Sequence, residues 1–244
     1  MHWRPRLLAA DPPELLVHDE DSTCPYLTDK TARMPLRVPT RMLSRREFEA
    51  RLGRGDRRQG ILLYRTTCAS CRACEPIRID ATRFRPGKTQ RRVLRRGAQA
   101  LTVQIGPPQL TDEKVALYNR HKFGRGLNSD NKPIDHEGYR VFLVDTCCDS
   151  FEIRYRLGDR LIGVAVTDRG ERSLSAVYFY FDPDMSDLSP GVFSILTQLE
   201  LCRRWGLRYL YLGLYVAECS SMAYKATYLP HERLVDGEWV MFER

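Results

Sequence analysis

The amino-acid sequence predicts an α+β protein with a mixed sheet and helices in its C-terminal half, plus a small cysteine-containing N-terminal subdomain. Three strand-like runs, Phe151–Arg156, Arg160–Thr167 and Ser173–Phe181, are joined by short Gly-Asp and Arg-Gly turns typical of hairpins. A long amphipathic helix is expected over residues 188–206, followed by a strand over residues 208–216. Strands, a helix and a returning strand indicate one mixed sheet covered by helices.

The remaining elements follow from local signals in the same way. A helix is expected over residues 43–55, where Ser44 is a suitable N-cap, and another over residues 111–126, capped by Thr111 or Asp112. Apolar runs predict strands over residues 60–66 and 76–84. The chain is expected to close with a short helix over residues 219–230 and a hairpin over residues 234–243.

Changes in residue composition and hydrophobic pattern along the chain divide it into three parts. Residues 1–22 are rich in proline and acidic residues and predict a loose N-terminal arm. Residues 23–100 form the predicted cysteine-containing subdomain, and residues 101–244 form the predicted C-terminal domain.

The charge of the chain is moderately basic and unevenly distributed. The 39 Lys and Arg residues exceed the 31 Asp and Glu residues, giving a net charge of +8. One stretch without an acidic residue holds seven of these cations, namely Arg83, Arg85, Lys88, Arg91, Arg92, Arg95 and Arg96. Such a run is either a solvated helix face or a phosphate-binding surface, and uncompensated repulsion favours the second.

The sequence shows no signal for export or membrane insertion. Its first apolar stretch is interrupted by Asp11, Pro12 and Pro13, and no apolar run approaches the ~18 residues that span a bilayer. A cytoplasmic protein is therefore expected, and its 8 cysteines should be thiols or metal ligands before disulfides.

The cysteine pattern suggests a metal site. Cys68, Cys71 and Cys74 are spaced C-x2-C-x2-C, and Cys24 is the natural fourth ligand. Four thiolates suit a tetrahedral Zn²⁺ or an Fe–S cluster, whereas the alternative is a set of small buried or redox-sensitive thiols in a turn.

Candidate site residues gather in the C-terminal half. Alternation places Leu174, Ala176, Tyr178 and Tyr180 on one face of their strand, which ends at Asp182. Ser189 and Gly191 open the long helix, where free N–H groups bind anions or are simply capped. Gly213 predicts a bulge or a close backbone approach in its strand, and Lys225 on the next helix is either an anion ligand or solvated.

The order of strands and helices is similar to that of the acyl-CoA N-acyltransferase (GNAT) superfamily. Relatives in that superfamily separate two strands at such a bulge to admit the acyl donor. The pyrophosphate-binding loop Q/RxxGxG/A of CoA-dependent members is absent before the long helix, where the sequence is SDLSPGV. A donor other than CoA is therefore expected.

Several segments resemble the arginyl/leucyl-tRNA–protein transferases, and most closely the bacterial aspartate/glutamate leucyltransferases. They occur in the family's order and span most of the chain: CPYLTDKTARMPLR, RRQGILLYRTTCASCRACEPIRI, KTQRRVLRR, SAVYFYFDPD, LSPGVFSIL and YLYLGLYVAECSSMAYKATYLP. The resemblance implies a cytoplasmic enzyme that moves leucine, or arginine, from charged tRNA to the N-terminal α-amine of proteins beginning with Asp or Glu. Such transfer marks those proteins for degradation and needs no ATP or other organic cofactor.

Within this hypothesis each candidate residue receives a role. Asp182 acts as the base or holds the donor's amino group, and Tyr178, Tyr180, Tyr211 and Tyr224 line the pocket. The acidic acceptor side chain is expected at Arg33, Arg65 and Arg78 beside the cysteines. The charged tRNA is expected at Lys88, Arg91, Arg92, Arg95, Ser189, Gly191, Tyr211, Gly213, Tyr224 and Lys225. The alternatives are a CoA-dependent N-acetyltransferase and a non-catalytic tRNA-binding protein.

Overall fold

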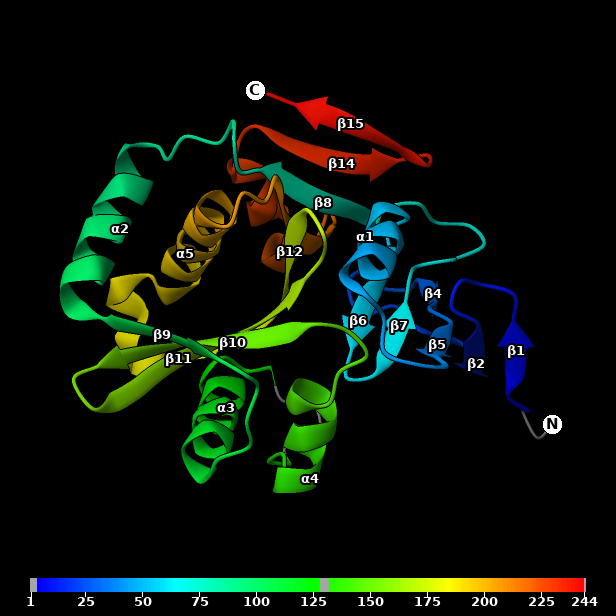
Figure 1. The fold of residues 1–244 in the computed structure, drawn as a ribbon, viewed down its shortest axis with the longest axis horizontal. Coiled ribbons are helices and arrows are strands. Elements are labelled where there is room, and N and C mark those ends of the chain that lie inside the picture. The colour runs from blue at the N-terminus through cyan, green and yellow to red at the C-terminus, as the bar shows by residue number, and fades with distance from the viewer. Residues whose placement is uncertain (1–3, 128–131, 244) are drawn as a thin grey trace.

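The computed structural model describes residues 4–127 and 132–243 and arranges them around an eight-stranded and a five-stranded sheet (Figure 1). The large sheet has the strand order β15-β14-β8-β13-β12-β11-β10-β9. Its strands are β8 (Glu75–Asp80), β9 (Thr102–Gly106), β10 (Ser150–Leu157), β11 (Arg160–Arg169), β12 (Ser173–Phe181), β13 (Tyr209–Tyr215), β14 (His231–Val235) and β15 (Glu238–Phe242). Among the described strand pairs of this sheet only β12 and β13 run parallel.

The N-terminal part forms the smaller sheet beside the large one (Figure 1). Its order is β1-β2-β5-β7-β6, and a separate hairpin pairs β3 with β4. The bounds are β1 (Arg6–Leu8), β2 (Glu14–His18), β3 (Asp21–Thr23), β4 (Thr31–Arg33), β5 (Leu36–Pro39), β6 (Arg57–Gln59) and β7 (Leu62–Tyr64).

Helices cover both faces of the large sheet. On one face lie α2 (Lys88–Ala100) and α5 (Pro190–Arg204), which share a core with Ile79 and Leu210 of the sheet. On the other lie α3 (Asp112–Gly124), α4 (His136–Tyr139) and the π-helical turn Arg140–Val144, around Tyr180. The remaining helices are α1 (Arg45–Gly53), α6 (Ser220–Ala223) and the 3₁₀ turns Pro183–Leu188 and Tyr224–Thr227.

The described residues contain no helix with the length and apolarity that a bilayer crossing requires.

The predicted helices and hairpins of the α+β fold are confirmed. At α1, the Ser44 hydroxyl accepts a hydrogen bond from the Glu47 N–H at 3.3 Å, and the Glu47 carboxylate accepts one from the Ser44 N–H at 2.8 Å. Thr111 caps α3 through the Lys114 N–H at 3.3 Å. These bonds satisfy backbone donors that a helix start leaves free, which explains why the caps are predictable from the sequence.

Two predicted boundaries differ from the structure. The loose arm expected over residues 1–22 contributes β1 and β2, and Glu14 of β2 is 1% exposed because Arg37 and Arg51 pair with it at 2.8 and 2.9 Å. The division at residue 100 is also wrong, since β8 pairs with β13 and β14 inside the large sheet. Buried ion pairs and long-range strand pairing decide these boundaries, and neither is visible in local composition.

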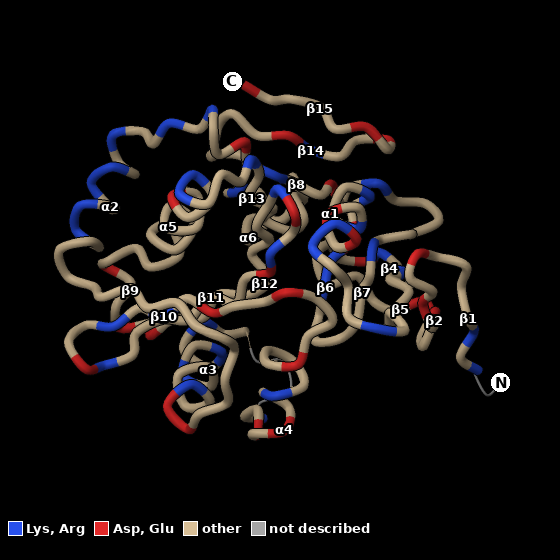
Figure 2. Tube along the Cα trace, viewed as in Figure 1, with Lys and Arg blue, Asp and Glu red and all other residues tan. Residues whose placement is uncertain are grey.

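A glycine sets the contact between α2 and α5. A Cβ on Gly97 would lie 2.3 Å from the ring of Phe193, so the two helices approach closely only because Gly97 has no side chain. The basic residues of α2 are exposed, and α2 lies at the edge of the molecule (Figure 2).

Candidate active site

The candidate active site lies where the parallel strands β12 and β13 separate. The two strands pair only over Ser173–Ser175 and Tyr209–Tyr211. Beyond that point Val177 is skipped in the register between β12 and β11, which makes it a bulge. Gly213 has φ +86° and interrupts the pairing of β13 with β8, so the bulge predicted there is present. Together the two irregularities end the backbone pairing of β12 with β13.

The bulge at Val177 reverses the faces predicted for β12. Leu174 and Ala176 pack in the core beneath α5, as one face of a regular strand would. Tyr178 and Tyr180 instead join the opposite core, around α3. The prediction that these four side chains share a face was wrong, because one inserted residue shifts the alternation and the sequence carries no marker for it.

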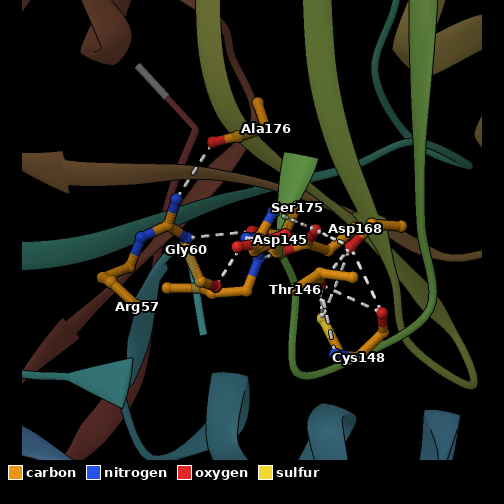
Figure 3. A network of polar contacts seen from close by, with 10 residues as sticks. Arg57, Gly60, Asp145, Thr146, Cys148, Asp168, Ser175 and Ala176 are labelled. Carbon is orange, nitrogen blue, oxygen red and sulfur yellow. Dashed lines mark hydrogen bonds and ion pairs between the residues drawn. The ribbon is translucent and has the colours of Figure 1, made fainter. Parts of the chain in front are cut away.

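Arg57 of β6 enters the gap between the two strands. Figure 3 shows its guanidinium directed at β12, where it donates to the Ser175 hydroxyl at 3.2 Å and to the Ala176 carbonyl at 3.0 Å. On the other side it approaches Gly213, whose Cβ would lie 3.4 Å from an Arg57 Nη atom. Arg57 therefore replaces strand pairing at the place where β12 and β13 diverge.

The charge of Arg57 has no carboxylate partner within the part of the chain that the structure describes. The side chain is buried, and burial lowers its pKa. The neighbouring Arg58, in contrast, forms an ion pair with Asp168 through hydrogen bonds of 2.7 and 2.8 Å. Arg57 was not among the site residues predicted from the sequence. The Arg57-Arg58 pair just before the strand predicted over residues 60–66 is the one feature of the sequence that could have indicated it.

Lys225 meets β13 one residue further along. Its Nζ donates to the Leu214 carbonyl at 2.6 Å and lies 3.1 Å from the Met222 sulfur, and the residue is 7% exposed. Burial and then the charge of Arg57 lower the pKa of Lys225 to about 7. The structure thus places this predicted ligand at the strand separation, buried rather than solvated.

Asp182 is held by two arginines at the end of β12. It is 1% exposed and pairs with Arg120 at 2.8 Å and with Arg160. Burial raises the pKa of Asp182, but the Asp184 N–H and the two arginines outweigh burial and hold it below its ordinary value. A carboxylate in this state accepts a proton poorly, so the geometry favours an anchor for two arginines over the predicted base.

The four tyrosines expected to line the pocket separate into two groups. Tyr180 is fully buried and shares a 2.5 Å hydrogen bond with Tyr139, and Tyr178 packs in the same core. Tyr211 is 2% exposed and accepts a bond from Arg78 at 2.9 Å. Only Tyr224, at 47% exposed, presents its ring to solvent among these four, so it alone is placed to stack on a base in this conformation.

The start of α5 forms one wall of a groove. Ser189 occupies the N-cap position with φ 53° and makes no side-chain capping bond, so the predicted capping is wrong. A groove of about 540 Å³ joins Ser189 to Lys88 at the start of α2 and to Thr227. A Cβ on Gly191 would meet no atom within 4 Å, which leaves the first turn of α5 approachable.

The three arginines expected to bind the acceptor each lie against a different carboxylate. Arg33 pairs with Asp19 at 2.8 Å, while Arg65 lies 3.7 Å from Asp56 and lines a groove of about 840 Å³ with Cys71 and Cys74. Arg78 lies on β8, where it pairs with Glu232 at 2.5 Å and stacks between the rings of Tyr209 and Trp239, 3.9 and 4.0 Å from their centres.

The predicted metal ligands are neighbours without forming a finished site. Burial and the nearby thiols of Cys24, Cys68 and Cys71 raise the pKa of Cys74 to about 12. In the described residues, however, no three His, Cys, Asp or Glu side chains are arranged to hold a metal ion. Metal binding by the four cysteines therefore stays a prediction.

The basic stretch becomes the exposed face of α2. Lys88, Arg91, Arg92, Arg95 and Arg96 are all exposed. Figure 2 shows Lys and Arg following one another along α2 with no Asp or Glu between them. None of the five forms an ion pair with a residue in the described ranges. Uncompensated cations along one helix suit a phosphate backbone.

Comparison with known proteins identifies the family of this chain. Models of the arginine-tRNA-protein transferase N terminus and C terminus match residues 22–92 and 113–235. The aspartate/glutamate leucyltransferase of Thiobacillus denitrificans is 40% identical over 225 residues, which cover 90% of this chain and 91% of that protein. This chain belongs to the arginine-tRNA-protein transferase family. The resemblance inferred from the sequence is therefore confirmed.

Other members of the arginine-tRNA-protein transferase family show the same extent of similarity. The aspartate/glutamate leucyltransferase of Chromobacterium violaceum is 37% identical over 216 residues, covering 88% of this chain and 89% of that protein. That of Aeromonas hydrophila is 39% identical over 219 residues, covering 88% of this chain and 90% of that protein.

Among solved structures, the alignment with FemX covers 86% of this chain and 79% of the FemX chain, with a TM-score of 0.44 and 8% identity.

Proposed function

We propose that this protein transfers leucine from leucyl-tRNA to the N-terminal α-amine of proteins that begin with Asp or Glu, in the cytoplasm, and so marks them for degradation. The observation that carries the proposal is the name aspartate/glutamate leucyltransferase, shared by relatives of 37–40% identity that match about nine tenths of the chain. The separated strands and the basic helix α2 support an acyl donor carried on RNA.

The reaction is an aminolysis. The deprotonated α-amine attacks the ester carbonyl, an amide bond forms, and the ester C–O bond breaks as the tRNA hydroxyl leaves with a proton. The ester is already activated, so no nucleotide or organic cofactor is required, and orienting the two substrates provides much of the acceleration. The protein's task is to hold an RNA end and a peptide end together.

Donor binding is assigned to residues at one side of the molecule. Lys88 and Ser189 share a groove, and Tyr224 is exposed beyond it on the 3₁₀ turn that also contributes Thr227. The last phosphodiester before the aminoacylated 3′ end would fit the uncapped start of α5 beside Lys88, since helix N–H groups and a lysine both attract anions. The α2 arginines then follow the RNA backbone.

A transfer assay tests the proposed function. The protein is incubated with radiolabelled leucyl-tRNA or arginyl-tRNA, or with acetyl-CoA, and with peptides starting with Asp, Glu or Ala. We expect label on the Asp and Glu peptides from leucyl-tRNA. Acetylation without RNA would select a CoA-dependent N-acetyltransferase, and binding of charged tRNA without transfer would select a non-catalytic tRNA-binding protein.

Neutralising α2 is expected to weaken RNA binding in a salt-dependent way. In the Arg91→Gln, Arg92→Gln, Arg95→Gln variant, the slope of log affinity against log salt should fall by about 2 to 3, because three phosphate contacts are lost. Filter binding of leucyl-tRNA at several salt concentrations measures that slope. The matched control replaces the exposed Arg4, Arg6 and Arg46 of the N-terminal part by glutamine. Equal losses in both triple variants would contradict an RNA site on α2.

The cysteines are proposed to bind Zn²⁺ or an Fe–S cluster with a structural role. Cys68, Cys71 and Cys74 lie on one loop after β7, and Cys24 lies near enough to affect the pKa of Cys74. Elemental analysis of anaerobically purified protein is expected to find zinc or iron bound to the chain and to lose it in Cys71→Ser. Metal content that is the same in Cys71→Ser and in a Cys202→Ser control would refute this proposal.

A further inference from the structure

Two buried cations lack an anionic partner at the separation of β12 and β13. Arg57 and Lys225 are each 7% exposed, and neither forms an ion pair with any residue the structure describes. They meet β13 at consecutive residues, Arg57 against Gly213 and Lys225 at the Leu214 carbonyl. Two uncompensated charges at one place are costly, and proteins retain such an arrangement where a ligand supplies the opposite charge.

Arg57 keeps hydrogen-bonding capacity for such a ligand. A guanidinium carries five N–H donors, and Arg57 directs one to the Ser175 hydroxyl and one to the Ala176 carbonyl. No other acceptor in the described residues takes a bond from it. The unused N–H groups of Arg57 and the ammonium of Lys225 are donors of the kind that a carboxylate accepts from.

A purely structural role accounts for these residues less well. If Arg57 served only to bond Ser175 and Ala176, a neutral amide would do so without the cost of burying a charge. The adjacent Arg58 shows the structural solution in the same strand, since its charge is neutralised by Asp168 at 2.7 Å. Within β6, therefore, one arginine is compensated by the protein and the other is not.

We propose that Arg57 and Lys225 form the subsite that binds the side-chain carboxylate of the acceptor's first residue. The assignment rests on the proposed function, and it replaces Arg33, Arg65 and Arg78 as the acceptor site. The carboxylate of Asp or Glu is only a few bonds from the α-amine. If the acyl group enters at the strand separation, as the proposed function requires, binding the carboxylate there brings the amine beside it. A neutral Asn or Gln side chain would leave both cations uncompensated, and is rejected for that reason.

The test combines direct binding with transfer. Peptides that differ only in Asp or Asn at the first position are labelled at the other end, and their affinities are measured without tRNA by fluorescence anisotropy. Wild type, Arg57→Gln and Lys225→Met are compared. Arg65→Gln is the control, because Arg65 lines the groove beside Cys71 and Cys74 and not the strand separation. The same peptides then serve as acceptors from leucyl-tRNA, and circular dichroism verifies that each variant is folded.

The expected result is that the wild type prefers Asp over Asn by about 100-fold or more, whereas Arg57→Gln and Lys225→Met lose most of that preference and Arg65→Gln keeps it. Loss of preference in Arg65→Gln alone would overturn the assignment in favour of the groove. If Arg57→Gln is unfolded, Lys225→Met decides, and an unchanged preference in that variant refutes the subsite. Arg57-dependent binding without any transfer would refute the proposed function and leave the subsite standing.

Discussion

Replacing Asp168 by alanine is expected to lower the free energy of unfolding by about 3–5 kcal/mol. Asp168 is fully buried and accepts bonds from Arg58 at 2.7 and 2.8 Å and from the Ser150 hydroxyl at 2.6 Å. Burial lowers the pKa of Arg58, and the charge of Asp168 overcomes that effect and raises it above its ordinary value. Without Asp168 the guanidinium of Arg58 stays charged and buried with only carbonyl partners, which accounts for the size of the loss.

Urea unfolding followed by circular dichroism measures this loss. The matched control is Asp149→Ala, which removes the partner of Arg45 at 2.6 Å where both side chains are exposed, and it should cost less than about 1 kcal/mol. A double variant, Arg58→Met with Asp168→Leu, removes both charges and should recover much of the stability. If Asp168→Ala matches the surface control, the pair does not stabilise the fold as argued.

The Arg58–Asp168 pair also has a consequence for the site. Asp168 belongs to β11 of the large sheet and Arg58 to β6 of the small one, so the pair joins the two sheets. Arg57 precedes Arg58 on β6 and reaches β12 because of that attachment. We therefore expect acceptor selectivity and global stability to depend on the same short strand.

Much of the fold was predictable because local chemistry encodes it. The capping box of Ser44 and Glu47 marks the start of α1, and Thr111 marks that of α3. The alternating runs and short turns of β10, β11 and β12 indicate antiparallel hairpins, and these form as expected. In each case the residues that decide the structure are only a few positions apart.

The rest depends on contacts between residues far apart in the chain. β8 enters the large sheet between β13 and β14, and nothing near residues 75–80 predicts those partners. The bulge at Val177 reverses the face on which Tyr178 and Tyr180 lie. Arg57 was not predicted because its hydrogen-bond partner Ser175 lies 118 positions away in the chain, and its burial arises only when the two segments come together in the fold. Single residues such as Gly213 and Lys225 were identifiable as candidates, but their joint position was not.

Replacing Lys225 by methionine is expected to stabilise the unliganded protein by roughly 3 kcal/mol near pH 6. Burial, with a further contribution from Arg57, lowers the pKa of Lys225 from 10.5 to about 7, so the folded state binds its proton less tightly than the unfolded state does. Methionine keeps a similar length without a charge. It loses the bond to the Leu214 carbonyl, which reduces the gain.

The dependence on pH identifies the charge as the cause. Below pH 7 both states of the wild type are protonated at Lys225 and the full cost of the buried ammonium is present. Between about pH 7 and 10.5 the unfolded state binds more protons, so wild-type stability rises and the advantage of Lys225→Met shrinks. Of the titratable groups around Lys225, the guanidinium of Arg57 lowers its pKa and the thiol of Cys219 raises it, so Cys219→Ser serves as the control. Melting temperatures at pH 6 and pH 9 measure the trend.

Two outcomes of Lys225→Met distinguish binding from a structural role. A variant that gains stability and loses its preference for acidic peptides would mean that the charge of Lys225 serves binding and destabilises the fold. A destabilised variant would indicate instead that Lys225 supports the structure.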